Sequence, residues 1–462
     1  MARHFFAALV RNTISLIGTA LAVASLTLFI TLFVVQSIGL EGGAYLGIFT
    51  FIFLPLCFVS GLLLIPVGIH RENKRIARAR GSESHFPVLD LNSEKTRKGM
   101  IVFIALTLFN IVVLAAATFE AVEFMDSNVF CGTVCHTVMQ PEFTAHGRSP
   151  HARVKCADCH IGPGAEWFVK AKISGSWQMI AVALDLYPTP IPTPIHNLRP
   201  ARDTCEQCHW PTKHYGDSLR VKSVFQDDEV NSEFKTAVLL KVGGLAGRES
   251  AGIHWHVDRD IKLEYHSDES REKIYEVELT NADGSVTVYT SGEEPPDDAN
   301  HHRTMDCVDC HNRPTHRYDM PGDAVNSAMG EGLIDKTLPY IKRESMRLLT
   351  AGYDSHDLAR NEIEQGLTSF YREQYPEIAA QQAPQITNAV AQLQEIYTSN
   401  VFPAMKVDWG TYADHSGHDG CFRCHGRLRT EDGKAIPRNC GYCHSVLAWE
   451  EEDPEILRTI NP

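Results

Sequence analysis

The sequence is short of positive charge, and it lacks a glycine-rich loop of the kind that cradles phosphate groups. Its 462 residues include 43 lysines and arginines against 57 aspartates and glutamates, which gives a formal net charge of −14. This balance argues against nucleic acid or an anionic surface as a partner, and it favours neutral or basic partners. We therefore set aside nucleotide and nucleic-acid chemistry.

Charge and histidine are both missing from three long apolar runs in the first quarter of the chain. The runs cover residues 14–35, 45–69 and 100–119, and each is long enough to cross about 30 Å of hydrocarbon as a helix. A cleavable signal would have a shorter apolar region and a small-residue cleavage site, and neither is evident. We predict a membrane domain at residues 1–124. Its transmembrane helices are expected at about 14–38, 44–69 and 99–122.

Cysteine is almost absent outside one repeated motif. Six close cysteine pairs are each followed directly by a histidine, in the order CGTVCH, CADCH, CEQCH, CVDCH, CFRCH and CGYCH, and we number these motifs 1 to 6. Of the 13 cysteines only Cys57 is left over, and we expect it to be an inert membrane-helix residue. The paired cysteines are Cys131, Cys135, Cys156, Cys159, Cys205, Cys208, Cys307, Cys310, Cys421, Cys424, Cys440 and Cys443. The motif histidines are His136, His160, His209, His311, His425 and His444.

This spacing predicts six covalently bound haem c groups. Two thiols add to the two vinyl groups of one porphyrin, and the next histidine is placed to ligate the iron. Paired cysteines also occur in structural zinc sites and in disulfides, but a histidine directly after each pair is typical of haem attachment. Motif 1 has three intervening residues instead of two, so a disulfide or a lone redox pair stays open there.

The charged loops predict the orientation in the membrane. Residues 70–99 carry eight lysines and arginines, whereas residues 36–44 carry none. Positive loops stay in the cytoplasm, so the N-terminus is expected there and the haem domain in the periplasm of a bacterial inner-membrane, multi-pass protein. Haem c is attached to proteins on the periplasmic side of the membrane, which agrees with this predicted orientation. Because the apolar runs contain no histidine, exchange with membrane quinone is expected at the outer surface, near motif 1.

The expected fold class is mostly α and irregular, with three N-terminal transmembrane helices and a periplasmic multihaem cytochrome c domain containing a small inserted β-hairpin lobe. Alternation on both sides of Asn281–Gly284 predicts the hairpin, and apolar residues three and four apart predict helices after residue 321. The expected segments are a haem core at 125–215 and 301–320, an inserted β-rich lobe at 216–300, a helical region at 321–400 and a C-terminal dihaem segment at 401–462.

A mixed apolar and basic stretch follows motif 2. This stretch mixes large apolar side chains with lysines, and such a composition favours a helix lying in the membrane interface. The residues are Trp167, Phe168, Ile173, Trp177 and Ile180, with Lys170 and Lys172. An ordinary core helix of the haem domain is the alternative.

The order and flanks of motifs 1 to 4 resemble the NapC/NirT family of membrane-anchored tetrahaem quinol dehydrogenases, which includes the NrfH type. The matching features are the third apolar run, CGTVCHTVM, SPHARVKCADCH, a lysine-bearing helix, CEQCH and CVDCHNRPTH, over about residues 100 to 320. The extra spans and haems look like larger inner-membrane members of the family. The resemblance implies oxidation of menaquinol at the membrane surface and transfer of electrons along closely packed haems to a periplasmic reductase or cytochrome.

The resemblance also implies roles for single residues. His151 corresponds to the distal ligand of the haem on His311, and His316 to that of the haem on His160. Met139 resembles the methionine that ligates the first haem, although it stands three residues after the histidine rather than two.

Carried over in the same way, Lys172 corresponds to a lysine that lines the quinol pocket. The alternative is a lysine of the membrane interface that contacts lipid phosphate. Gln178 stands where the family has an acidic residue, and it cannot accept a proton. Glu142, Glu166 or Asp185 would then supply the base.

The remaining irons need further distal histidines. His301 or His302 before motif 4, and His415 or His418 before motif 5, are placed to reach a neighbouring haem. The other histidines outside the membrane domain are His146, His196, His214, His254, His256, His266 and His356.

Three functions remain open at this stage. The first is a quinol-oxidising electron-transfer protein in contact with lipid and the quinone pool. The second is a haem subunit of a larger respiratory or photosynthetic complex, with electrons running in either direction. The third is a terminal reductase with one open haem position, which the abundance of histidines and the absence of a CxxCK motif disfavour.

Overall fold

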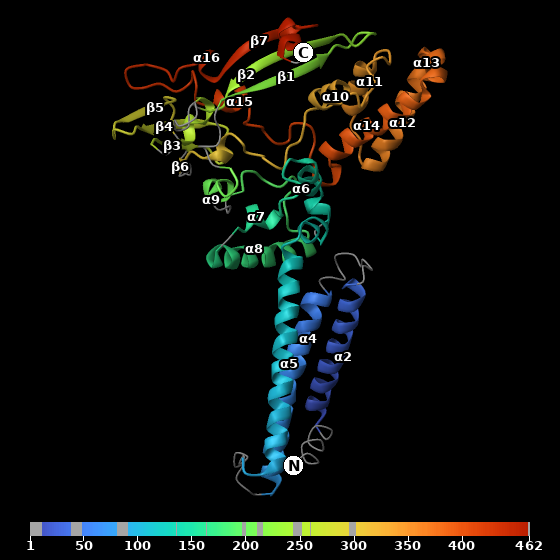
Figure 1. Ribbon diagram of the computed structural model, residues 1–462, viewed down its shortest axis with the longest axis vertical. Helices are drawn as coiled ribbons and strands as arrows, with labels where there is room; N and C mark the ends of the chain where they lie inside the picture. Colours follow the sequence, from blue (N-terminus) through green and yellow to red (C-terminus); the bar gives the residue numbers. More distant parts are fainter. Residues whose placement is uncertain are drawn as a thin grey trace. The chain divides into compact units, whose positions relative to one another are not determined.

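The computed structural model describes residues 12–37, 49–80, 91–134, 136–162, 164–195, 200–209, 216–243, 252–258, 260–294 and 302–460. The chain divides into two units, residues 1–134 and 135–462. The predicted fold class is confirmed, because the chain is mostly helical and irregular, with three long apolar helices near the N-terminus and small antiparallel sheets (Figure 1).

The N-terminal unit is built from three helices that could each cross a membrane. They are α2 (Thr13–Ser37), α4 (Leu54–Arg80), which follows the π-helical turn η1 (Phe49–Phe53), and α5 (Glu94–Met125). Within their most apolar stretches only 11–22% of the residues are buried, so most apolar side chains face outward, where lipid can cover them.

Small residues let α2 and α4 pack closely. A Cβ on Gly18 would lie 2.8 Å from the carbonyl oxygen of Gly61, and a Cβ on Gly61 would lie 2.7 Å from the backbone of Gly18. The Ser15 hydroxyl donates to the carbonyl oxygen of Ile65 at 3.0 Å. Small residues at a helix contact and a hydroxyl bonded to backbone are typical of helix pairs in membranes.

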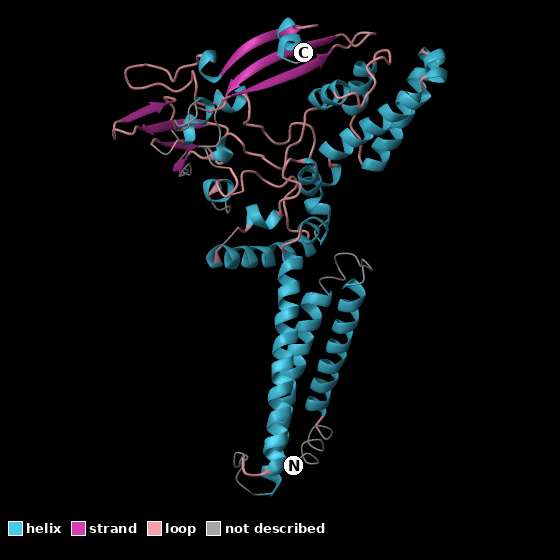
Figure 2. Ribbon diagram, viewed as in Figure 1, coloured by secondary structure: helices cyan, strands magenta, loops and turns pink. Residues whose placement is uncertain are grey.

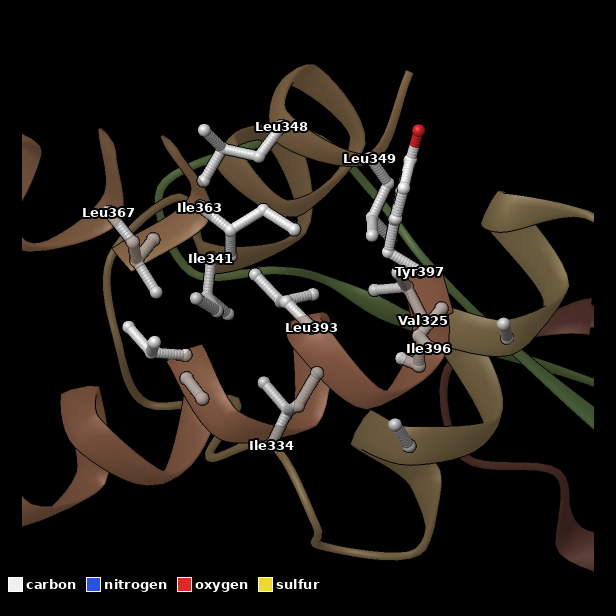
Figure 3. Close-up of a cluster of buried hydrophobic side chains, with 14 of the residues drawn as sticks. Val325, Ile334, Ile341, Leu348, Leu349, Ile363, Leu367, Leu393, Ile396 and Tyr397 are labelled. Carbon is white, nitrogen blue, oxygen red and sulfur yellow. The ribbon is translucent and has the colours of Figure 1, made fainter. Parts of the chain in front are cut away.

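The C-terminal unit contains a helical layer with its own apolar core (Figure 3). In α12 the buried residues Ala359, Ile363, Leu367 and Tyr371 recur every four positions, which places them on one face of the helix. Ser355 caps the helix by accepting a hydrogen bond from the backbone N–H of Leu358. The helices are α10 (Pro321–Gly330), α11 (Ile341–Leu349), α12 (His356–Gln374), α13 (Pro376–Gln381) and α14 (Ala383–Asn400).

The strands form two separate sheets (Figure 2). The first has the order β1-β2-β7 and the second the order β5-β4-β3-β6, and every strand pair is antiparallel. The strands are β1 (Asp217–Phe225), β2 (Glu233–Lys241), β3 (Lys262–Ser267), β4 (Ile274–Thr280), β5 (Val286–Thr290), β6 (His302–Thr304) and β7 (His444–Glu451).

The predicted hairpin is confirmed as β4 and β5. Its turn is closed by Asn281, whose backbone N–H donates to the carbonyl oxygen of Ser285 at 2.9 Å, and Gly284 supplies a positive φ of 80°. The lobe is not closed on itself, because β7 comes from the C-terminal end of the chain and pairs with β2.

The other described helical segments lie in the cysteine motifs, between them or near the C-terminal end of the described chain. They are η2 (Phe130–Val134), α6 (His136–Arg148), α7 (Cys156–His160), α8 (Ala165–Ala183), α9 (Ala201–Cys205), η4 (Gly252–Val257), η5 (Cys307–Asp309), η6 (Pro403–Met405), α15 (His418–Cys421), α16 (Cys440–Cys443) and α17 (Glu455–Ile460).

Candidate functional site

Motifs 2 to 6 each lie on or beside a short helical turn. Residues i, i+3 and i+4 share one face of a helix, so a turn brings both cysteines and the histidine of a CxxCH motif to the same side. The backbone N–H of His209 donates to the carbonyl oxygen of Cys205 at 2.7 Å. The same bond closes motif 4 at 2.8 Å and motif 5 at 3.1 Å. The local fold thus presents the two thiols and the imidazole together.

Sheet β5-β4-β3-β6 anchors motif 4. Asp309, inside the motif, is buried and accepts a hydrogen bond from the Tyr265 hydroxyl of β3 at 2.5 Å. The Arg303 guanidinium of β6 also donates to this carboxylate, at 3.3 Å. Cys424 of motif 5 and Leu428, three residues after the motif, pack against the apolar face of the same sheet.

The described motifs lie next to one another in their order along the chain. Helix α7 of motif 2 contacts α9 of motif 3, and α9 contacts η5 of motif 4. The side chains of Cys205 and Cys307 lie close together. Between motifs 4 and 5, Arg423 Nη2 donates to the carbonyl oxygen of Asp309 at 2.7 Å.

The last step of this series joins motif 5 to motif 6. His418, just before Cys421, lies with its ring centre 5.9 Å from that of His444. For motif 1, Cys131 lies in η2, whereas Cys135 and the side chain of His136 are outside the described residues.

Four motif histidines each have a second imidazole nearby. Two imidazoles bound to opposite faces of one iron, with metal–nitrogen bonds of about 2.0 Å, have ring centres about 6 Å apart. The observed separations of the ring centres are 6.1 Å for His160 and His316, 5.8 Å for His209 and His151, 5.8 Å for His425 and His256, and 5.9 Å for His444 and His418. These spacings fit one iron between each pair.

The hydrogen bonds of these rings also fit haem ligands. His425 and His256 each use Nδ1 for a backbone carbonyl oxygen, at 2.7 Å to Pro437 and 2.9 Å to Ile253, which leaves Nε2 for a metal. The Nδ1 atoms of His151 and His444 are buried without a hydrogen-bond partner among the described residues.

Burial favours the neutral imidazole that binds a metal. Desolvation lowers the pKa of His160, and the nearby charge of His316 lowers it further. Desolvation likewise lowers the pKa of His256. A neutral ring is the form that can donate a lone pair to iron.

The other predicted ligands lie in different surroundings. His302 of β6 faces His266 of β3 with 4.7 Å between ring centres, closer than two imidazoles across one iron. His415 is buried, and its Nε2 lies 3.0 Å from Glu272 Oε1. His301 is outside the described residues. Met139 is half-buried on α6. Among the described residues no cluster of three or more His, Cys, Asp or Glu side chains could hold a free metal ion.

Glu142 has two polar partners, His316 and Arg313. Its carboxylate lies 2.9 Å from His316 Nδ1 and 3.0 Å from Arg313 Nη2. Burial alone would raise the pKa of Glu142, but the hydrogen bond and charge of His316, together with Arg313, hold it below its ordinary value. A carboxylate held in this way is a weak base, and Arg313 is a residue that sequence reasoning missed.

Helix α8 carries Lys172 and Gln178. Lys172 is half-buried and Gln178 is exposed, with its Nε2 donating to Ser174 Oγ at 3.4 Å. Six positions along a helix place the two residues about 120° apart around its axis. Large apolar side chains on α8 are exposed, with 68% of Ile173 and 61% of Trp177 accessible. The Lys170 ammonium lies 4.8 Å from the centre of the Trp167 ring.

Comparison with known proteins identifies the family of the chain. The family profile described as NapC/NirT cytochrome c family, N-terminal region, matches residues 93–191. Cytochrome c-type protein ImcH of Geobacter sulfurreducens is 40% identical over 452 residues, which cover 96% of this chain and 89% of that protein. No solved structure matches the chain significantly. With three apolar helices ahead of its cysteine–histidine motifs, the chain belongs to the NapC/NirT cytochrome c family, as a membrane-anchored multihaem c-type cytochrome of electron transport.

Proposed function

We propose that this protein is a six-haem quinol dehydrogenase that takes electrons from menaquinol at the periplasmic face of a bacterial inner membrane. It passes them one at a time along its haems to a periplasmic cytochrome or reductase. The observation that carries the proposal is the unbroken series of motifs 2 to 6, with imidazole pairs about 6 Å apart at four of them.

The proposed haem ligands follow from these pairs. Covalently bound haem c supplies the one-electron carrier at each motif. We assign His316 to the haem on His160, His256 to the haem on His425 and His418 to the haem on His444.

For His151 the geometry favours a different haem from the one that the resemblance implied. The resemblance places His151 at the haem on His311, but its ring lies against that of His209. We therefore propose the haem on His209 as its partner. His302 and His415 are left without an iron by this proposal, since their rings lie against His266 and Glu272.

Filled axial positions favour relay over terminal reduction. A reductase needs an open iron position for its substrate, whereas a relay needs both positions filled and the carriers close together. If both imidazoles of each pair bind the iron, the haems at these four motifs would have no open position. The contacts between successive motifs support an electron path in chain order, from motif 2 to motif 6.

The exit is proposed at motif 6. Tyr442, between its cysteines, is 65% exposed, and Cys440 is exposed as well. Exposed glutamates, Glu450 and Glu451, follow in β7. A basic or neutral soluble redox protein suits this surface.

The quinol site is proposed on α8. Its exposed apolar face suits the interface where quinol resides, and Lys172 provides a donor to a quinol oxygen. Because Glu142 is bound to Arg313 and His316, we propose Asp185 as the base instead. Asp185 is exposed just after α8 and accepts a hydrogen bond from the Tyr187 hydroxyl. The side chain of Glu166 lies outside the described residues.

Anaerobic stopped-flow absorbance tests the function. The detergent-purified protein is mixed with a menaquinol analogue, and carbon monoxide binding is followed in the same samples. Rapid reduction of several low-spin haems without a carbon monoxide adduct is expected. No reduction by quinol, together with a haem that binds carbon monoxide, would instead favour a terminal reductase or a subunit fed by another protein.

A further inference from the structure

A carboxylate and a guanidinium, those of Glu142 and Arg313, both contact His316. Glu142 Oε2 lies 2.9 Å from His316 Nδ1, and the carbonyl oxygen of the same glutamate lies 3.1 Å from that nitrogen. The carboxylate side chain is only 17% exposed. Nδ1 is thus committed to Glu142, and Nε2 is the nitrogen left for the iron.

Hydrogen bonds and two aromatic rings hold the Arg313 side chain in place. Its Nε donates to the carbonyl oxygen of His316 at 2.6 Å, and its Nη2 donates to both oxygens of Glu142, at 3.0 and 3.3 Å. The guanidinium carbon lies 4.1 Å from the Tyr412 ring centre and 5.0 Å from that of Tyr318. Stacking and paired hydrogen bonds fix a planar guanidinium in one orientation.

These contacts join two parts of the chain that serve different motifs. Glu142 lies on α6, between motifs 1 and 2, whereas Arg313 and His316 follow motif 4 directly. The ring centre of His316 lies 6.1 Å from that of His160, in motif 2. Glu142 of α6 therefore binds the loop that follows motif 4. The same loop carries His316, the second imidazole beside motif 2.

A carboxylate on Nδ1 makes a histidine a stronger ligand. When Nδ1–H donates to a carboxylate, electron density at Nε2 rises and the ring orientation is fixed. A stronger donor stabilises ferric over ferrous iron, so it lowers the reduction potential of the haem. Arg313 limits this effect because it shares the charge of the same carboxylate.

We infer that Glu142 and Arg313 are positioning residues that set the ligand strength of His316, and through it the reduction potential of the haem on His160. The inference rests on the proposed function in one respect, the assignment of His316 as that distal ligand. It goes beyond the proposed function because it names the groups that set the reduction potential of this haem.

The variant that tests the inference is Glu142→Gln. Glutamine can still accept a hydrogen bond from Nδ1–H, but it carries no charge. We expect one haem potential to shift to a more positive value in a spectroelectrochemical titration, with a changed low-spin electron paramagnetic resonance signal from the same haem. Glu142→Asp keeps the charge and should restore part of the shift.

A matched control is Glu344→Gln. Glu344 is a buried carboxylate paired with Arg343 and Arg347 in α11, within the helical layer. Its loss removes a similar buried ion pair without touching a proposed haem ligand, so all haem potentials should stay at their parent values. A Glu142→Gln variant with parent potentials and a parent resonance signal would overturn the inference.

His316→Ala separates this failure from failure of the ligand assignment. If His316 ligates iron, this variant converts one haem to high spin, and the inference then depends on Glu142→Gln alone. If the spectrum of His316→Ala equals that of the parent, the assignment fails, and the inference fails with it. Reduction by quinol is measured separately and decides neither result.

Discussion

His256 and His425 lie with their ring centres 5.8 Å apart, although the inserted sheet, motif 4 and the helical layer separate them in the chain. Each ring donates its Nδ1–H to a backbone carbonyl oxygen, so Nε2 of both rings is left to bind a metal. This pair gives the most direct test of ligand assignment from ring geometry.

Replacing His256 is expected to open one haem. His256→Ala should convert a single haem, the one on His425, from low to high spin and allow it to bind carbon monoxide, because one axial ligand is gone. Absorbance and magnetic circular dichroism measure the change. The matched control is His356→Ala, since Nε2 of His356 lies 2.6 Å from the carbonyl oxygen of Val401, beside Phe402. Equal spectra for His256→Ala and the parent would contradict the assignment.

His151 is expected on the haem attached at Cys205 and Cys208. A crystal structure of the haem-loaded protein would place its ring nitrogen at about 2.0 Å from that iron, opposite His209. A bond from His151 to the iron of motif 4 would restore the assignment implied by the family resemblance and reject ours.

Lys172 is expected to matter for quinol but not for the haems. Lys172→Ala should slow haem reduction by a menaquinol analogue about a hundredfold, because a donor to the quinol oxygen is lost, while reduction by dithionite keeps its rate. Lys170→Ala is the matched control on the same helix, as Lys170 contacts Trp167. Equal rates of reduction by quinol for Lys172→Ala and the parent would remove Lys172 from the site.

The helical layer is expected to limit the stability of the C-terminal unit. Leu367 is fully buried in α12 (Figure 3), so Leu367→Ala should lower the free energy of unfolding by about 2–5 kcal/mol through lost burial and the cavity left behind. Denaturant titration followed by circular dichroism measures this. Leu358→Ala, at a position 40% exposed on the same helix, should cost far less. Similar losses for both variants would argue against the core as described.

Local patterns predicted much of this architecture. Charge-free apolar runs long enough to cross a bilayer predicted α2, α4 and α5, and apolar spacing predicted helices such as α12 and α14. The alternation on both sides of Asn281–Gly284 predicted the β4–β5 hairpin. In each case the signal lies within about thirty consecutive residues, and burial on one face enforces it.

Pairings across the chain could not be predicted in this way. The sequence could not single out His256 among the other histidines as a ligand candidate. Its proposed partner, His425, is remote in sequence, so no local pattern joins the two. Strand β7 pairs with β2, although the residues of the helical layer lie between the two strands in the sequence. The residues of β7 alone do not predict which strand it pairs with. Arg313 carried no signal at all, since its role depends on Glu142 and on two tyrosines that meet it only in the folded chain.

The most direct test of the whole relay uses proteoliposomes that hold the protein and menaquinol in the bilayer, with a basic soluble cytochrome added outside. The account predicts anaerobic reduction of the added cytochrome at a rate that depends on both the protein and menaquinol, and that falls in Lys172→Ala vesicles. Two results together would contradict the central claim that quinol is the donor. The added cytochrome would stay oxidised when menaquinol is the reductant, and it would be reduced readily by protein that dithionite had reduced beforehand.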